Sequence, residues 1–377
     1  MPTPTCVADQ TRQSEPCGGL SSRFTATYTP GEIMSTSATW PLLEADNVSV
    51  TFPVSGGLLS KKRVVQAVSQ VTLALHAGET LGLVGESGSG KSTLGRALLQ
   101  LERVSAGDVR FDGHRITHGL KSDVARLREQ TAMIFQDPFA SLNPRQTLGE
   151  SIAEVLRVHQ KVPRHAVAAR VAELLTLVGL RPEQASARPG QLSGGQCQRA
   201  GIARALAIEP RLIVADECVA ALDVSIQGQI VNLLMDLRDK MGLAILFIAH
   251  DLAIVRRLCD RVAVMYLGRI VEEGPAEAVF TRPRHPYTAA LVAAIPEIDP
   301  DKPLPDTALG GEPPSPIAVP QGCAFHPRCP YAQVQCRTDA PPTRQIADHA
   351  WTCVLTHAGD KTVFPLTEGS FDEAQAC

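Results

Sequence analysis

Short apolar segments alternate along most of the chain with longer segments whose apolar residues recur at helical spacing. The apolar runs predict strands buried on both faces, at residues 80–84, 131–135, 212–215 and 244–249. The segments of helical spacing predict helices at residues 93–101, 194–208 and 227–241. Strands and helices that alternate in this way form a mainly parallel sheet covered on both faces. The pattern therefore predicts the α/β fold class.

Weaker patterns surround this core. Residues 43–52 and 64–75 alternate as half-buried strands, and residues 107–111 predict another strand. Amphipathic spacing at 151–158 and 164–178 predicts a small helical insertion. Short strands are expected near 260–274, followed by a helix that ends at about residue 294. Beyond that helix the chain is rich in proline, and little regular structure is expected.

Composition narrows the class of protein. Residues 1–40 are rich in Thr, Ser, Pro and Gly and predict a disordered extension. The net charge of −3 and the 4% aromatic content give no reason to expect a nucleic-acid partner. The sequence has no apolar run of about 18 residues and no signal-peptide pattern at its start, so we expect a cytosolic location. Ten cysteines in such a compartment are not expected to form disulfides.

A glycine loop between a predicted strand and a predicted helix carries the clearest chemistry. Residues 85–92 read GESGSGKS, the pattern that cradles the phosphates of a nucleoside triphosphate. Backbone N–H groups and the helix dipole make such a loop an anion site. Lys91 is expected to reach the β- and γ-phosphates, and Ser92 to bind Mg²⁺. The candidate nucleotide-binding residues here are Gly85, Glu86, Ser87, Gly88, Ser89, Gly90, Lys91, Ser92 and Thr93.

Two carboxylates follow the apolar strand at 212–215. In an open parallel sheet, ligands gather where the strands end, so Asp216 and Glu217 should lie beside the phosphate loop. We expect Asp216 to hold Mg²⁺, directly or through water. Glu217 is then placed to polarise the water that attacks the γ-phosphate.

A second helix start resembles an anion site. Residues 192–196 read LSGGQ, with Ser193 at the N-cap position of the helix predicted at 194–208. Gly194 and Gly195 allow a ligand to approach the backbone closely. A second helix N-terminus suited to anions is not explained by one phosphate loop.

With this motif in place, residues 42–290 resemble the ATP-binding subunits of ABC transporters. The resemblance implies a P-loop NTPase fold with an antiparallel β subdomain and a helical subdomain. It also implies that Ser193, Gly194, Gly195 and Gln196 form the signature, which closes on ATP held by a second ATPase subunit. The implied boundaries are a disordered extension at 1–40, an ATPase domain at 41–284 and a C-terminal module at 285–377.

The resemblance assigns further residues. Gln136 matches the glutamine that contacts Mg²⁺ and the attacking water, and His250 matches the histidine that contacts the γ-phosphate. Asp223 matches the D-loop, and Phe52 the aromatic residue that stacks on adenine. The chain departs from the family pattern at three positions near these motifs, Cys197, Cys218 and Ala220. None of them removes a proposed catalytic group, although they put the rate of turnover in question.

Four cysteines cluster near the C-terminus. Together with His285-Pro286-Tyr287, their segment makes the chain similar to the dipeptide and oligopeptide importer branch, and most similar to the second ATPase of a dipeptide permease. The cysteines can hold iron–sulfur or Zn²⁺, or they can be free structural thiols. The resemblance favours a 4Fe–4S cluster, which would stabilise a segment with too few apolar residues for its own core. The proposed ligands are Cys323, Cys329, Cys336 and Cys353.

The resemblance also implies a function and its partners. It implies an ATPase at the cytoplasmic face of the membrane that energises uptake of di- and oligopeptides, with ATP and Mg²⁺ as cofactors. The expected partners are a paralogous ATPase subunit, two transmembrane permease subunits and, indirectly, an extracytoplasmic binding protein. The alternatives are the same machinery with nickel or another small solute, or an ABC ATPase with no transport role.

Overall fold

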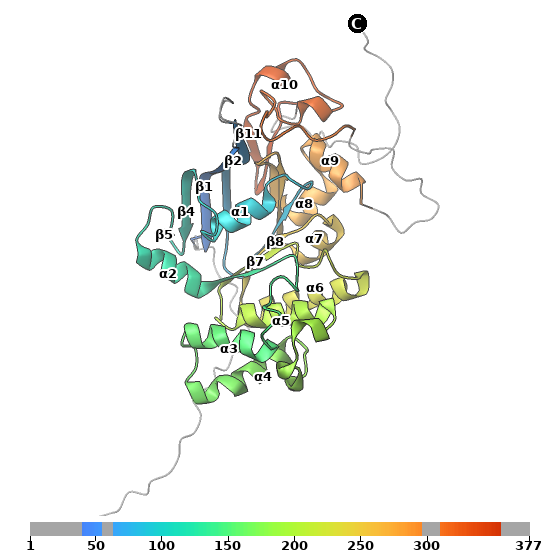
Figure 1. Ribbon diagram of the computed structural model, residues 1–377. Coiled ribbons are helices and arrows are strands. Elements are labelled where there is room, and N and C mark those ends of the chain that lie inside the picture. Colours follow the sequence, from blue (N-terminus) through green and yellow to red (C-terminus); the bar gives the residue numbers. More distant parts are fainter. Residues whose placement is uncertain (1–39, 55–62, 296–309, 356–377) are drawn as a thin grey trace, which may run out of the picture. The chain divides into compact units, whose positions relative to one another are not determined.

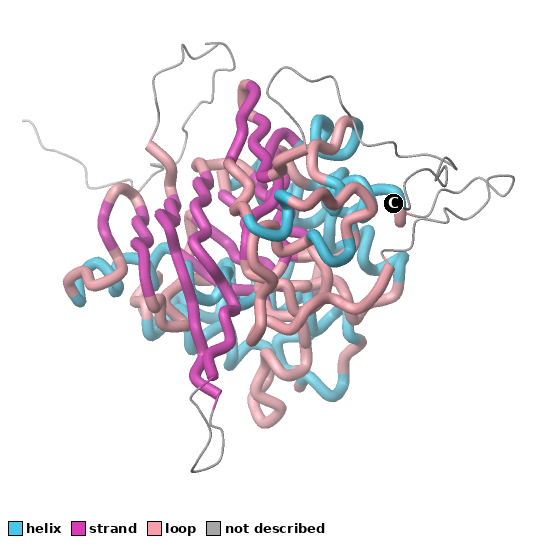
Figure 2. The backbone as a smooth tube through the Cα atoms, turned by 90° about the horizontal axis from the view of Figure 1, so that it is seen from above, coloured by secondary structure: helices cyan, strands magenta, loops and turns pink. Residues whose placement is uncertain are grey.

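The computed structural model describes residues 40–54, 63–295 and 310–355 (Figure 1). The disorder predicted for residues 1–40 lies outside these ranges except at Trp40. The described residues form two sheets and the helices that pack on them, with strands in magenta and helices in cyan in Figure 2.

An eight-stranded sheet contains the predicted parallel core. Its strand order is β11-β12-β10-β9-β3-β8-β7-β6. The strands from β9 to β6 run parallel, whereas β10, β12 and β11 are antiparallel to their neighbours. The bounds in chain order are β3 Thr80–Val84, β6 Thr131–Ile134, β7 Leu212–Asp216, β8 Ala244–Ile248, β9 Arg261–Tyr266, β10 Arg269–Pro275, β11 Thr343–Ile346 and β12 His349–Thr352.

A four-stranded antiparallel sheet accounts for the half-buried strands. Its order is β2-β1-β4-β5, with β1 Leu43–Val54, β2 Arg63–Leu75, β4 Ala106–Phe111 and β5 His114–Arg115. Alternating residues of β1 and β2 are buried, as expected of strands that turn one face to the core.

Ten α-helices complete the described part of the chain. Four of them were not predicted from the sequence. In α2 only Leu127 is fully buried, so its apolar pattern is weak, and α7, α8 and α10 are too short for periodicity to identify them. The bounds are α1 Lys91–Leu98, α2 Lys121–Gln130, α3 Leu148–Val158, α4 Val167–Leu177, α5 Gly194–Leu206, α6 Val224–Met241, α7 Leu252–Leu258, α8 Ala276–Thr281, α9 Pro286–Ala293 and α10 Gln335–Thr338.

The eight-stranded sheet is apolar on both faces. In β7, Leu212 and Val214 pack into one buried cluster with α1 and the antiparallel sheet. Ile213 and Ala215 pack into another cluster, with α3 to α8. A strand buried on both faces needs a continuous apolar run, which is why the sequence identified these strands clearly.

The segment after α9 is more ordered than the sequence predicted. The expectation of little regular structure was wrong for β11 and β12, because β12 pairs with β10 and extends the main sheet. Phe325 is 1% exposed and packs edge-on against Tyr266 of β9, with ring centres 5.3 Å apart. Its apolar contacts therefore lie in the core of the ATPase fold rather than in a core of the segment itself.

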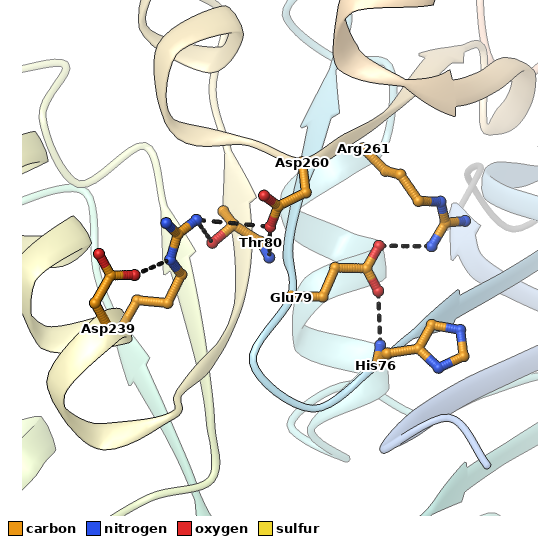
Figure 3. A network of polar contacts seen from close by, with 7 residues as sticks. His76, Glu79, Thr80, Asp239, Asp260 and Arg261 are labelled. Carbon is orange, nitrogen blue, oxygen red and sulfur yellow. Dashed lines mark hydrogen bonds and ion pairs between the residues drawn. The ribbon is translucent and has the colours of Figure 1, made fainter. Parts of the chain in front are cut away.

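Polar contacts fix the amino end of β3 (Figure 3). The backbone N–H of Thr80 donates to Asp260 Oδ2 at 2.8 Å, just before β9. Arg261 Nη1 donates to Glu79 Oε1 at 2.7 Å, and its other terminal nitrogen pairs with Glu273. These side chains tie β3, β9 and β10 together at the end of the sheet opposite the glycine loop.

Candidate functional site

The glycine loop connects β3 to α1, as predicted, and glycine is required at both of its ends. Gly85 and Gly90 have φ angles of 147° and 103°. A Cβ atom on Gly85 would lie 2.1 Å from the carbonyl oxygen of Met265, and one on Gly90 would lie 2.1 Å from that of Ala67. Neither a side chain nor an ordinary backbone conformation fits at these positions.

The loop is bonded to the turn that follows β9. The N–H of Gly268 donates to the carbonyl of Ser89 at 2.8 Å, and the carbonyl of Gly268 accepts from the N–H of Ser69 in β2. The Ser89 hydroxyl is buried and, among the described residues, has no hydrogen-bond partner. A phosphate oxygen inside the loop would supply one.

Lys91 is buried inside the site. Its Nζ donates to the carbonyl oxygens of Gly85 at 2.8 Å and of Glu86 at 2.9 Å, which closes the loop. Burial lowers the pKa of Lys91, and the nearby carboxylates of Glu217, Asp216 and Glu86 oppose this shift. The carboxylates of Asp216 and Glu217 beside this lysine make a site that favours an added cation.

Asp216 connects the end of β7 to the start of α1. The Ser92 hydroxyl donates to Asp216 Oδ1 at 2.6 Å, and Arg96 Nη2 lies 3.6 Å from Asp216 Oδ2. Asp216 is 3% exposed, so its charge is sheltered from water. The structure therefore brings together Ser92 and Asp216, two of the three residues that the sequence analysis assigned to Mg²⁺.

Glu217 and Gln136 also meet. Gln136, just beyond β6, donates from Nε2 to Glu217 Oε2 at 2.8 Å. Glu217 has a φ of 46°, unusual for a residue with a Cβ, and its N–H donates to the carbonyl of Ile248. A strained backbone at a strand end re-aims the side chain, and such strain is common at functional sites.

His250 lies where β8 leads into α7, a helix that the sequence analysis missed. Asp251 caps this helix, because its carboxylate accepts from the N–H groups of Ala253 and Ile254 at 2.8 and 3.3 Å. The exposed His250 is thus held at the carboxyl end of β8, next to β3 and β7 in the sheet. An Asp followed by an apolar repeat was the signal that would have identified this cap.

The LSGGQ segment forms a capped helix start. Ser193 Oγ accepts from the N–H of Gln196 at 3.3 Å, while Gln196 Oε1 accepts from the N–H of Ser193 at 3.0 Å. A Cβ atom on Gly195 would lie 2.7 Å from Ile226 in α6, so this glycine also allows close helix packing. Nothing in these contacts links Ser193 to the phosphate loop of its own chain.

Two predicted nucleotide contacts stand apart from this cluster. Asp223 is exposed at the N-cap of α6, next to the LSGGQ helix. Phe52 is 37% exposed on β1, opposite Val65 of β2. The departures from the family pattern at Cys197 and Cys218 are buried in the core, where burial raises the pKa of the Cys218 thiol to about 12.

Sequence reasoning missed two residues that hold Glu86, the second residue of the loop. The N–H of Glu86 donates to the hydroxyl of Tyr287 in α9 at 2.9 Å. Arg328 binds the Glu86 carboxylate through two hydrogen bonds, of 2.7 and 2.9 Å. His285 caps α9, and burial lowers its pKa to about 3, so it stays neutral. The His-Pro-Tyr motif was noticed in the sequence, but its contact with the loop was not predictable.

The four C-terminal cysteines line one small cavity. Backbone N–H groups donate to Cys323 and Cys329, and the N–H of Gln333 lies 3.4 Å from Cys336 Sγ. Burial raises the pKa of Cys323, and raises that of Cys329 to about 12. Within the described ranges, no three His, Cys, Asp or Glu side chains meet in a way that would hold a single metal ion.

A strand, a glycine loop with Lys and Ser, and an acidic pair at the end of another strand of the same parallel sheet define a P-loop nucleoside triphosphatase. Residues 68–220 match the family described as ABC transporter, and residues 271–336 match the C-terminal region of oligopeptide/dipeptide transporters. A solved dimer of an ATP-binding cassette with ADP and Pi has a TM-score of 0.56 and 28% identity, covering 62% of this chain and 98% of that chain.

Relatives across most of the chain have similar names. The Probable peptide ABC transporter ATP-binding protein y4tS of Sinorhizobium fredii is 48% identical, over 81% of this chain and 87% of its own length. The Di/tripeptide transport ATP-binding protein DppF of Pseudomonas aeruginosa is 44% identical, over 83% and 97%. The Oligopeptide transport ATP-binding protein OppF of Escherichia coli is 49% identical, over 83% and 96%.

The chain therefore belongs to the oligopeptide/dipeptide branch of ABC transporter ATP-binding subunits. This confirms the family, the ATPase fold and the ATPase class inferred from the sequence motifs. No helix in the described ranges is both long and apolar enough to span a membrane.

The geometry of the loop predicts the effect of a single methyl group. Gly90→Ala should destabilise the folded chain by more than about 3 kcal/mol, because strain adds to a backbone clash with Ala67. Gly113→Ala is the matched control, since Gly113 also has a positive φ but open space around it, and should cost about 1 kcal/mol. Urea unfolding measures both. Equal losses would contradict the close approach of the loop to β2.

Proposed function

We propose that this chain binds and hydrolyses ATP to energise uptake of di- and oligopeptides through partner membrane permeases. The observation that carries the proposal is the cluster of Lys91, Ser92, Asp216, Glu217 and Gln136, linked around the glycine loop by short contacts. The peptide substrate is supported by the names of the relatives, each matched over most of its length.

Ser92 and Asp216 fit a Mg²⁺ site. This ion takes oxygen ligands and is commonly bound by one or two carboxylates together with substrate phosphates. Asp216 supplies one buried carboxylate 2.6 Å from the Ser92 hydroxyl, and Gln136, whose amide nitrogen donates to Glu217, retains its amide oxygen as a further oxygen donor. When bound, the ion would neutralise charge on the phosphates.

Glu217 is the candidate general base. Its half-buried carboxylate is oriented by Gln136 and by the bond from its own N–H to Ile248. A carboxylate in this position accepts a proton from the attacking water, and the exposed His250 at the end of β8 can contact the γ-phosphate. Lys91 and the loop N–H groups stabilise the negative charge of the phosphates.

The signature residues are proposed to act on a second subunit. In α5, the cap uses the N–H of Gln196, and that of Cys197 donates to the Ser193 carbonyl. The N–H groups of Gly194 and Gly195 remain for an anion, as is general for the first turn of a helix. ATP held by a partner would supply that anion. By resemblance, the partner is a paralogous ATPase, with Asp223 at the contact between the two subunits.

A groove beside Gln136 is the proposed contact with the permeases. It has a volume of about 660 Å³ and lies between residues 140–144, α3 and Arg204 of α5. Val158, which lines the groove, is 69% exposed. The lining begins at Ala140, four residues after Gln136 in the chain, so changes at the nucleotide can reach a partner bound there. The chain would then sit at the cytoplasmic face of the membrane, with an extracytoplasmic binding protein acting through the permeases.

The four cysteines are proposed to hold a 4Fe–4S cluster. In such a cluster each thiolate binds a different iron atom, so the sulfur atoms surround a group rather than one ion. The four cysteines share one cavity, and the resemblance to peptide-importer ATPases favours iron–sulfur over Zn²⁺ there. Backbone N–H groups directed at three of the sulfurs suit bound thiolates.

The assignment of the base predicts a separation of binding from hydrolysis. Glu217→Gln should keep ATP affinity and lose hydrolysis by about 10² or more, because the amide cannot accept the proton. Lys91→Ala should lose ATP affinity itself. Equilibrium binding of labelled ATP and phosphate release measure the two effects. Hydrolysis by Glu217→Gln at the parental rate would refute the role of Glu217.

If the groove is the contact with the permeases, a charged substitution on its surface should weaken their association with the chain. Val158→Glu should reduce co-purification with the permease subunits at least about tenfold, because a charge would be buried in an apolar contact. ATP binding by the isolated chain should not change. Leu120→Glu is the control, since Leu120 is 73% exposed at the start of α2. If both variants retain the permeases equally, the contact lies elsewhere.

The cluster predicts iron and acid-labile sulfide in anaerobically purified protein, with visible absorbance that is lost on oxidation. Cys329→Ser should lower the iron content sharply, whereas Cys259→Ala, a buried thiol outside the cavity, should not. Zinc without iron, or neither metal, would rule the cluster out.

A further inference from the structure

Arg328 joins the C-terminal segment to the phosphate loop. Its Nη1 and Nη2 atoms donate to Glu86 Oε2 and Oε1 at 2.7 and 2.9 Å, a two-pronged ion pair between residues 242 positions apart. The Arg328 side chain is 5% exposed and that of Glu86 26%. Paired hydrogen bonds of this kind are among the strongest that side chains form, and they fix orientation as well as charge.

The guanidinium of Arg328 is held on its other sides as well. Its Nε donates to the carbonyl of Gly310 at 3.1 Å, and its central carbon lies 5.9 Å from the centre of the Tyr266 ring. A guanidinium stays protonated in proteins. Arg328 is therefore a permanent and positioned charge, unlike a surface arginine whose pairing is transient.

Without Arg328, the Glu86 carboxylate would weaken the binding of phosphates in the nucleotide site. It is the second residue of the loop, its carbonyl accepts from Lys91 Nζ at 2.9 Å, and its N–H donates to the Tyr287 hydroxyl. A bare carboxylate at this point would repel the phosphates and compete with them for Lys91. Arg328 neutralises that charge through the two hydrogen bonds to the Glu86 carboxylate.

We propose that Arg328 is a positioning residue of the nucleotide site, which neutralises Glu86 and fixes the first turn of the phosphate loop. ATP affinity is then a property of the C-terminal segment as well as of the ATPase core. This inference rests on the proposed function, because it takes residues 85–92 to be the site that holds the phosphates.

The test is ATP affinity in the full chain, measured by equilibrium binding of labelled ATP with Mg²⁺. Arg328→Gln should weaken binding about tenfold, which corresponds to about 1.4 kcal/mol. Adding Glu86→Gln to this variant should restore affinity to within about threefold of the parent, because the unpaired charge is then gone. A merely structural role for Arg328 predicts no such rescue.

Two further variants keep the test decisive if Arg328→Gln folds poorly. Arg328→Lys keeps the charge but loses the paired geometry, and should weaken binding by about threefold. Arg337→Gln removes an exposed arginine of the same segment and should leave affinity unchanged. Unchanged affinity in both Arg328 variants, or a double variant no better than Arg328→Gln alone, would overturn the proposal.

Lys91→Ala separates this inference from the proposed function. If it loses ATP binding while the Arg328 variants keep it, only the role of Arg328 is wrong. If Lys91→Ala binds ATP normally, the phosphates lie elsewhere and the proposed site itself fails.

Discussion

The close approach of the phosphate loop to two backbone carbonyls is the constraint on which the rest of the structure depends. Gly85 lies against Met265 of β9, and Gly90 lies against Ala67 of β2, at distances that leave no room for a Cβ atom. Because β2 belongs to the antiparallel sheet and β9 to the main sheet, the loop is where the two sheets meet. The antiparallel sheet therefore contacts the phosphate loop directly and forms part of the nucleotide site.

The two ends of the main sheet have different roles. At the carboxyl ends of its parallel strands stand Gln136, Asp216 and Glu217, His250 and the loop itself, as open α/β sheets generally place their ligands. At the amino end of β3, paired charges such as Arg261 with Glu79 bind neighbouring strands to one another. At the amino end of β3 the charges are paired with one another. Around Lys91, by contrast, the nearby carboxylates favour binding of a cation together with phosphates.

The sequence predicted those elements that a short run of consecutive residues identifies. The buried strands were clear because residues such as 212–215 are apolar without interruption, and the loop because its glycines, Lys91 and Ser92 follow one another. Helix α7 was missed since seven residues hold too little periodicity, although Asp251 marked its start. Gln136 and Glu217 were assigned to the same attacking water, Gln136 by resemblance, but neither their direct hydrogen bond nor the positive φ of Glu217 was predicted.

The C-terminal segment could not be predicted correctly, because its contacts are made with residues far away in the sequence. From the sequence, we expected a metal centre to stabilise this segment, because it has too few apolar residues to form its own core. In the structure, Phe325 packs on Tyr266 and β12 extends the main sheet. Its cysteines are therefore not required to explain why the segment is folded. Cys329 directly follows Arg328, so a group held by these cysteines would instead lie close in sequence to the side chain that binds Glu86.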